Sequence, residues 1–422
     1  MKTLRSISAL VLFSIVATAS AQGPGSAGAL FLLIQPSLRA NGMGGTSVSS
    51  VENDALGIAF NPARLGVWAN ENFFMAEFYP AKSDWLAGLA PDIFYDARTF
   101  IAGYNLKRLD HRIPVSLGVG YTHVNLDLGE IAVTGPDDPT TPIAVLHIVE
   151  RAKLWTLGLG FDYWIKAGFG WSFKSIESDL GPAIIENLVY PASTNIKAHD
   201  FGVVLYAPGE EILARLTGKT LELRPGVRPV FGLGLGYSKS NIGSTISYID
   251  IAQPDPLPRT ARMGVSLSAG LASTRHGRPW RIVSLEHQYE TEQLLVRITD
   301  RRSVSYANFL GDINFFKNVI LRQENSKIIT KVGWELGANE FVFLRYGHYK
   351  DPLGRVDYRT FGASISSYGL LNAIFQPTPR SPIWMRWLAE HLDVRYDYSS
   401  YDFEEGHPLS RTDFHGMRIR LF

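Results

Sequence analysis

The residue types that most often carry catalysis form no recognisable catalytic set in this chain. Its ten histidines are scattered, and no H-E-x-x-H pair places two of them on one helical face to hold zinc. No glycine-x-serine-x-glycine stretch supplies the exposed nucleophile of a hydrolase. The stretch 42–45, Gly-Met-Gly-Gly, lacks the Lys-Ser/Thr of a phosphate-binding loop and indicates a tight turn. We therefore expect no enzymatic activity, no metal site and no cofactor.

Charged residues offer two weaker possibilities. Acidic side chains cluster at Asp137-Asp138 and at Asp402/Glu404/Glu405, where they could bind calcium or belong to solvated loops. A second group lies opposite the apolar positions of alternating segments and could line an aqueous path, pair internally, or pair with another segment. Its members are Lys107, Asp162, Lys166, Lys331, Glu335, Asp393, Arg395 and Asp397.

The elements that must position these residues are strands. Between Trp155 and Lys166 large apolar residues alternate with small or polar ones, which gives a strand one apolar face. The pattern recurs through most of the chain and predicts fourteen strands, an even number, as bacterial single-chain barrels have. They span 72–79, 94–107, 114–128, 152–166, 167–175, 198–206, 229–240, 260–273, 280–290, 327–337, 340–349, 356–368, 390–401 and 411–422.

The N-terminus predicts export. Residues 1–21 have a positive start, an apolar stretch and a small-x-small site at Ala19-Ser20-Ala21, as signal peptides do. An exported chain of alternating strands, with no apolar helix after the signal, predicts an all-β fold. The expected architecture is a transmembrane antiparallel β-barrel in the outer membrane of a Gram-negative-type envelope, in contact with outer-membrane lipid. A soluble β-sandwich or periplasmic β-domain is the alternative.

Connection lengths support a membrane barrel. Turns near 108–113, 166–167, 274–279 and 338–339 are short, whereas loops near 80–93, 129–151, 176–197, 241–259 and 291–326 are long, the usual outer-membrane asymmetry. The connections 207–228 and 369–389 are long on the short-turn side. Within the first, Glu210 to Leu216 predicts a short amphipathic helix, either packed on the rim or docking a partner.

Composition excludes other classes. With 41 basic against 40 acidic residues the net charge is +1, so no global field indicates nucleic acid. The chain has no cysteine, which rules out disulfides and thiolate metal sites. Many of the 39 glycines fall on one face of the alternating segments and would suit a crowded lumen.

Residues 22–70 do not alternate. Their glycines and proline predict compact, irregular backbone, which most simply folds into or under the barrel as a plug or hatch. The expected organisation is thus a signal peptide at 1–21, a plug segment at 22–70 and a barrel at 71–422.

Three stretches carry a family resemblance: Phe31 to Ile34, Arg39 to Gly45, and Asn61 to Leu65. They resemble the start of the PorV/PorQ outer-membrane family, with an apolar run, an arginine, a G-M-G turn and an N-P-A-x-L motif. Strands near 333–336, 341–347 and 360–363 are similar to the end of that family. The resemblance implies a fourteen-stranded barrel like that of the FadL fatty-acid transporter, with the N-terminal segment inside.

The resemblance also implies a role. Members of this family serve the type IX secretion system, either by shuttling cargo that bears a C-terminal signal domain or within the surface attachment complex. The implied partners are other secretion-system proteins and those signal domains. FadL-type relatives instead carry hydrophobic small molecules, and this is the alternative.

The candidate site residues are those of the N-terminal motif: Arg39, Gly42, Met43, Gly44, Asn61, Pro62 and Ala63. Asn-Pro favours a turn, and Arg39 suits bidentate pairing with a carboxylate on the barrel wall. At the other end, terminal Phe422 is out of phase with Met417, Ile419 and Leu421, so either the register slips or the last strand ends early.

Overall fold

The computed structural model describes residues 27–422 apart from 72, 89–91, 135–139, 186–187, 249–253, 276–277, 301–302, 375–381 and 404–406. The expected signal peptide at 1–21 lies outside the described residues.

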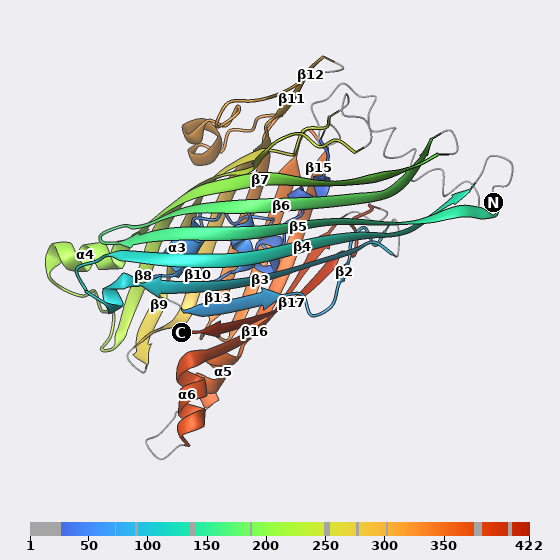
Figure 1. Ribbon diagram of the computed structural model, residues 1–422. Coiled ribbons are helices and arrows are strands. Elements are labelled where there is room, and N and C mark those ends of the chain that lie inside the picture. The colour runs from blue at the N-terminus through green and yellow to red at the C-terminus, as the bar shows by residue number, and fades with distance from the viewer. Residues whose placement is uncertain are drawn as a thin grey trace.

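Fourteen antiparallel strands form a closed ring (Figure 1). Each pairs with its neighbour in the chain, and β1 closes the ring by pairing with both β17 and β3. The ring consists of β1 (Phe74–Phe78), β3 (Phe94–Asn105), β4 (Val115–Thr134), β5 (Pro142–Asp162), β6 (Lys166–Ile185), β7 (Leu188–Pro208), β8 (Val227–Gly243), β9 (Thr260–Arg275), β10 (Arg278–Leu294), β13 (Ile329–Ala338), β14 (Val342–Asp351), β15 (Val356–Ser366), β16 (Leu392–Asp402) and β17 (Asp413–Leu421).

Three short strands lie outside this cycle. β2 (Ser83–Asp84) pairs with the first residues of β3, and β11 (Val296–Asp300) pairs with β12 (Ser303–Tyr306) as a separate hairpin. The ring has a turn end, where short turns join strands such as β5 and β6, and a loop end, where the longer connections lie.

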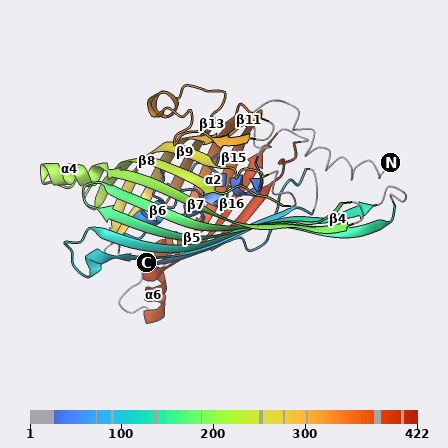
Figure 2. The same ribbon diagram turned by 45° about the horizontal axis from the view of Figure 1, so that its top comes forward.

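Each of the fourteen predicted strands overlaps one strand of the ring, so the predicted fold class is confirmed. The predicted loops 129–151 and 176–197 are wrong. Strands β4 to β7 continue through most of these residues and project beyond the rest of the ring (Figures 1 and 2). Bulges after Asp127 and Asp179, at Gly129 and Gly181, interrupt the register there. Residues 143–149 of the projection, Ile-Ala-Val-Leu-His-Ile-Val, place apolar residues on both faces of a strand, so no clear alternation marks the projection in the sequence.

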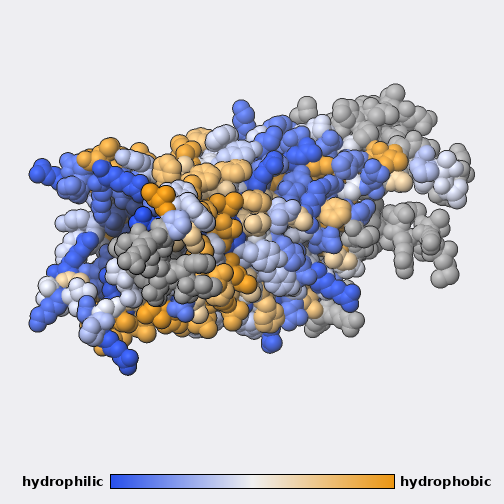
Figure 3. All heavy atoms as spheres, turned by 90° about the horizontal axis from the view of Figure 1, so that it is seen from below, coloured by the Kyte–Doolittle hydropathy of each residue, from blue (hydrophilic) through white to orange (hydrophobic). Residues whose placement is uncertain are grey.

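The exterior of the ring carries a belt of exposed apolar side chains. Each strand of the ring from β3 to β16 contributes at least one, and Figure 3 shows orange atoms gathered between more polar ends. Representative members are Phe100, Leu117, Leu157, Trp171, Leu205, Leu233, Leu267, Leu285, Leu336, Leu344, Ile365 and Tyr396. Because the ring is closed, the backbone N–H and C=O groups of its strands are hydrogen-bonded to neighbouring strands, and the apolar belt suits contact with the hydrocarbon core of a membrane. The fold is that of a transmembrane β-barrel.

Helices lie in the connections at the turn end. The amphipathic helix expected in 207–228 is present as α4 (Gly209–Thr217), with Glu210 and Glu211 in its first turn and Gly218 ending it at φ 68°. The connection 369–389 contains two helices that the sequence did not predict, α5 (Ser367–Ile374) and α6 (Ile383–His391). Within the described ranges, no helix is both long and apolar enough to cross a membrane.

The N-terminal segment, residues 27–70, folds as short helices joined by turns. These are η3 (Leu30–Leu33), α2 (Leu38–Asn41), η4 (Leu56–Ala59) and α3 (Arg64–Trp68), drawn in blue behind the strands in Figure 1. Two further short helices, η5 (Leu106–Arg108) and η6 (Phe315–Ile320), lie in connections. The N-terminal segment is almost wholly buried and contacts the inward-facing residues of the strands.

The end of the chain resolves the phase problem of the last strand. β17 ends at Leu421, so Phe422 lies beyond the ladder. Its backbone N–H donates to the His391 carbonyl at 3.1 Å, and its ring lies 5.0 Å from that of Tyr368. The strand therefore ends early rather than slipping its register.

Candidate functional site

A row of glycines receives the N-terminal segment. Across β3 to β7, five glycines pair directly in register: Gly103, Gly118, Gly158, Gly170 and Gly202. All point inward, and a side chain on any of them would collide with residues 61–69. Because no side chain separates them, α3 and the turn before it pack on the backbone of the wall. We call this row the glycine row.

The Asn61-Pro62-Ala63 motif forms the turn that meets this row. Asn61 is fully buried, its side-chain oxygen accepts from the Ala63 N–H at 3.1 Å, and its Nδ2 donates to the Val48 carbonyl at 2.6 Å. Pro62 lies against Gly170. The predicted turn is present, and it joins residue 48 to the start of α3.

The Gly42-Met43-Gly44 turn seats the segment on the opposite side of the barrel. The Gly44 N–H donates to Thr360 Oγ1 at 2.8 Å, and its φ of 69° is left-handed. A β-carbon there would approach backbone oxygens of His348 and Val332, so only glycine fits both the dihedral and the space. Met43 is fully buried, and Gly42 ends α2 against Gly362.

Arg39 is the main ionic anchor of the segment. Its Nε and Nη2 donate to Glu335 on β13 at 2.9–3.2 Å, the bidentate geometry predicted from the sequence. Nη2 also reaches Glu286 on β10 at 2.7 Å, and Nη1 reaches Ser50 at 3.0 Å. With 1% of Arg39 exposed, the pairs are shielded from water.

A second ionic group joins the segment to the seam of the ring. Asp54 accepts from Arg64 Nη1 at 3.0 Å and from Ser37 Oγ at 2.8 Å. Burial acts to raise the pKa of Asp54, but the nearby arginines Arg64, Arg418 and Arg39 outweigh it and hold that pKa below its usual value. Arg418 on β17 in turn pairs with Glu77 on β1 at 3.1 Å.

The other inward charges pair as well. Lys331 reaches Glu292 at 2.5 Å, and Lys107 reaches Asp162 at 2.7 Å. Asp393 pairs with Arg420 at 3.3 Å, Asp397 with Arg345 at 3.1 Å, and Lys166 with Glu71 at 2.9 Å. Arg395 lies over the ring of Phe343 at 3.7 Å. Of the three sequence interpretations, pairing among the wall residues and pairing with the N-terminal segment therefore describe these charges better than an open aqueous path.

The interior of the loop end is apolar and aromatic. Buried side chains from the segment, from inward positions of the strands and from the loop between β8 and β9 form one cluster, which we call the apolar layer. Its members are Ala29, Phe31, Leu32, Leu38, Leu56, Ala59, Tyr79, Tyr95, Ala97, Val124, Leu126, Ala152, Leu154, Ile176, Ile196, Ala198, Ile246, Leu257, Tyr401 and Phe414. A cavity of about 20 Å³ beside Phe31 and Leu154 is lined by members of this layer together with Ile34, Pro36, Phe60 and Lys174.

One polar group in the apolar layer lacks a partner. Tyr79 donates to the Pro36 carbonyl and Tyr401 to Asn41, both within 2.9 Å. The Tyr95 hydroxyl is fully buried, and no hydrogen-bond partner for it exists among the described residues. Buried hydroxyls are normally paired, so Tyr95 is a candidate contact for the polar group of a ligand.

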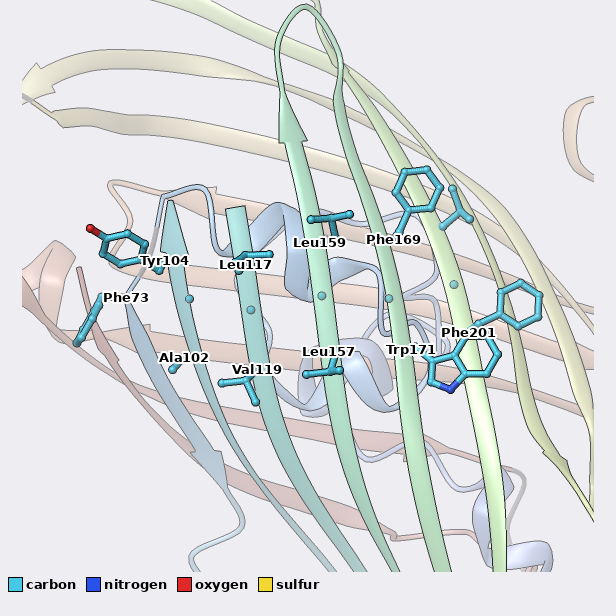
Figure 4. A pocket seen from close by; sticks show the side chains of 16 residues that line it. Phe73, Ala102, Tyr104, Leu117, Val119, Leu157, Leu159, Phe169, Trp171 and Phe201 are labelled. Carbon is cyan, nitrogen blue, oxygen red and sulfur yellow. The ribbon is translucent and has the colours of Figure 1, made fainter. Parts of the chain in front are cut away.

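Outside the barrel, a shallow apolar groove of about 800 Å³ lies on the membrane face over the glycine row. Figure 4 shows its walls: Leu117, Leu159 and Phe169 along one side, with Val119, Leu157 and Trp171 along the other. The groove and the packed turn 61–63 therefore lie on opposite faces of the same stretch of wall.

Among the described residues, no group of three or more histidine or acidic side chains is arranged to hold a metal ion. Asp137-Asp138, Glu404 and Glu405, raised above as calcium ligands, lie outside the described residues. The sequence analysis did not identify Glu286 or Tyr95 as site residues, and it did not predict the register of the glycine row. The roles of these residues depend on pairing between segments that are distant in the chain. The alternation does place Tyr95 on a strand, which is the one signal that could have indicated it.

No model of a protein family matches this sequence, and no curated protein matches it. Solved structures similar to it include the toluene transporter TbuX of Ralstonia pickettii, with 11% identity and a TM-score of 0.39 over 92% of this chain and 97% of that one. The toluene transporter TodX of Pseudomonas putida has 10% identity and a TM-score of 0.37, over 91% and 96%. A FadL homologue of Pseudomonas aeruginosa has 10% identity and a TM-score of 0.37, over 92% and 97%.

Proposed function

We propose that this protein is an outer-membrane carrier of apolar small molecules, and that the apolar layer is where it binds them. The observation that supports this most is the chemistry of the interior. A water-filled barrel presents polar side chains to its lumen. Here the inward positions at the loop end include Leu126, Leu154, Ile176 and Ile196, packed against Phe31 of the N-terminal segment.

The packing indicates how a ligand would enter. The cavity of about 20 Å³ is smaller than any organic ligand, so binding requires side chains of the apolar layer to move aside. The residues that hold Phe31 and Leu38 in place belong to the same N-terminal segment, which we propose acts as a hatch. Arg39 and the glycine row would fix its closed position.

Ligand titration tests this proposal. Purified protein in detergent is titrated with toluene, which has no polar group, and with dodecanoate, which has one. We expect saturable binding of at least one probe, weakened by Leu154→Gln in the apolar layer. Leu221→Gln, a matched change at an exposed position on the turn end, should leave binding unchanged.

Tyr95→Phe separates the two ligand classes. Loss of the hydroxyl should weaken dodecanoate binding by about fivefold, the equivalent of one hydrogen bond, and should leave toluene binding unchanged. Folding of each variant is checked by heat-dependent migration on detergent gels. If neither probe binds saturably to folded protein, the carrier proposal fails.

A second candidate, a component of the type IX secretion system, is supported by the projection of β4 to β7. Among the described residues, β4 pairs only with β5 beyond Asp127, and β7 pairs only with β6 before Ala198. Each therefore presents an open backbone edge, the kind of edge that accepts a strand from another protein. A purified type IX signal domain should bind the intact protein, and should fail to bind a variant whose β4–β5 and β6–β7 tips are shortened to the bulges.

A further inference from the structure

The connection between β10 and β13 folds against the outside of the barrel, as the brown ribbon shows in Figures 1 and 2. Its inner side is held by a small core in which Leu295, Ala307, Ile313 and Ile328 pack against Ala261 of β9. Its position is thus fixed by burial. The connection is therefore an ordered part of the outer surface of the barrel.

The outer side of this connection is apolar. Within and just after η6, Phe316 is 70% exposed, Leu321 64% and Ile320 48%, while Val319 on the inner side is buried. η6 is a π-helix, and the Leu321 N–H donates to the Phe316 carbonyl at 2.9 Å. Residues spaced by four and five positions therefore share one side, which gathers these three exposed side chains together. We call this side, with Phe309, the η6 face.

Phe309 joins the η6 face to the membrane belt. Its ring stacks on Tyr237 with centroids 4.8 Å apart and lies 5.5 Å from Phe201. Phe201 stacks in turn on Trp171, an exposed member of the belt. The apolar surface of the barrel therefore reaches Phe309, on the same connection as η6, which indicates that this connection contacts the same lipid as the belt.

Cations border the η6 face. Lys317 and Arg322 are exposed, and Lys239 lies 5.3 Å from the centre of the Phe309 ring. Arg322 contacts His287 at 2.9 Å and lies over the Tyr289 ring. Over the described ranges, none of Lys317, Arg322 and Lys239 has a carboxylate within 4 Å.

The neighbouring acids already have partners of their own. Asp312 pairs with Arg297 at 3.4 Å and with Lys327 at 3.9 Å, and Glu324 pairs with Lys350 at 2.6 Å. The cations at the η6 face are therefore available to an anion from outside the protein.

We propose that the η6 face binds a phosphate-bearing anionic lipid in the leaflet at the loop end. Its acyl chains would cover Phe316, Ile320 and Leu321, and its phosphate would lie beside Lys317 and Arg322. Apolar side chains beside lysine and arginine are the pattern by which proteins hold anionic lipid at a membrane surface. This site needs only a membrane-embedded barrel, so it stands apart from either proposed function.

A single introduced cysteine makes the site measurable, because the native chain has none. Ile320→Cys carries a fluorescent donor, and the protein is reconstituted in phosphatidylcholine vesicles with headgroup-labelled phosphatidylglycerol or phosphatidylcholine as acceptor. We expect stronger energy transfer to phosphatidylglycerol. The same donor on Leu221→Cys, at the turn end, should show no preference between the two lipids.

Charge removal then tests the mechanism. Lys317→Ser with Arg322→Ser should lower the preference for phosphatidylglycerol about fivefold for each charge removed. Lys219→Ser with Arg224→Ser, exposed cations at the turn end, should not change it. Equal transfer to both lipids, or a preference that survives in the Lys317/Arg322 variant, overturns the proposal. Transfer between donor- and acceptor-labelled protein copies at low protein density would show that a second copy covers the face, and would also overturn it.

Discussion

Removing the Arg39 guanidinium should weaken the protein more than any surface charge does. In Arg39→Met the side-chain volume is nearly kept, but two buried carboxylates lose their partner. Glu335 retains Arg345 at 2.5 Å, whereas Glu286 retains only neutral partners, the Gln288 amide at 2.9 Å and the Ser50 hydroxyl. Breaking a buried pair from one side costs about 3–5 kcal/mol, since it leaves an uncompensated charge. We expect a loss of that size in the free energy of unfolding.

The reasoning also predicts a rescue. Arg39→Met combined with Glu286→Gln removes the stranded charge and should recover about 1–3 kcal/mol, the cost of leaving a buried group unpaired. The control is Lys107→Met, which breaks a half-exposed rim pair with Asp162 and should cost less than about 1 kcal/mol.

The assay for these variants is urea unfolding in detergent, followed by tryptophan fluorescence. Hydrogen exchange over residues 38–69 reports whether the N-terminal segment is released. An Arg39→Met variant as stable as Lys107→Met, or a double variant no better than the single one, would refute this account of the anchor.

Three further outcomes follow from the interior. Gly170→Ala drives a β-carbon into the Pro62 backbone and should cost about 1–3 kcal/mol by overpacking. Gly120→Ala, whose β-carbon meets side-chain methyl groups of Ile58, Ile101 and Leu65 rather than backbone, should cost less in the same urea assay. The pKa of Asp54 is lower in the folded state than in the unfolded state. The ionised carboxylate therefore stabilises the fold fully above the unfolded pKa, and this stabilisation is lost as the pH falls through the folded pKa. The free energy of unfolding, measured between neutral and strongly acidic pH, should fall with a pH-dependent contribution that Asp54→Asn abolishes. Because the inward charges are paired and the apolar layer is filled, planar bilayers should show no large, steady conductance, and a porin-like current would contradict the closed interior.

The sequence predicts the ring of strands well because a wall between lipid and interior imposes a period of two. Leu117, Val119 and Tyr121 alternate with glycine and threonine for that reason, and β4 begins where predicted. The same signal is interrupted farther along this strand. Residues 129–134 remain in β4, but the bulge at Gly129 breaks the alternation, so the sequence predicted a loop there.

The interior is less predictable because its partners come from distant segments. Arg39 indicates a carboxylate partner, yet Glu335 lies 296 residues away, and nothing in the local pattern selects it over Glu286 or Glu290. The glycines of β3 to β7 indicate a crowded lumen. That Gly118 faces Gly158, and Gly158 faces Gly170, follows only from the register of the hairpins.

The short strand β1 gives the N-terminal segment a mechanical role. The ring closes through only five residue pairs with β17 and five with β3, far fewer than join β4 to β5. Glu77 at this closure accepts from the backbone N–H groups of Ala55 and Leu56 as well as from Arg418. Hydrogen bonds from the N-terminal segment thus reinforce the closure of the ring at β1. Displacing residues 54–56 would therefore weaken the ring at the closure, where few residue pairs join the strands.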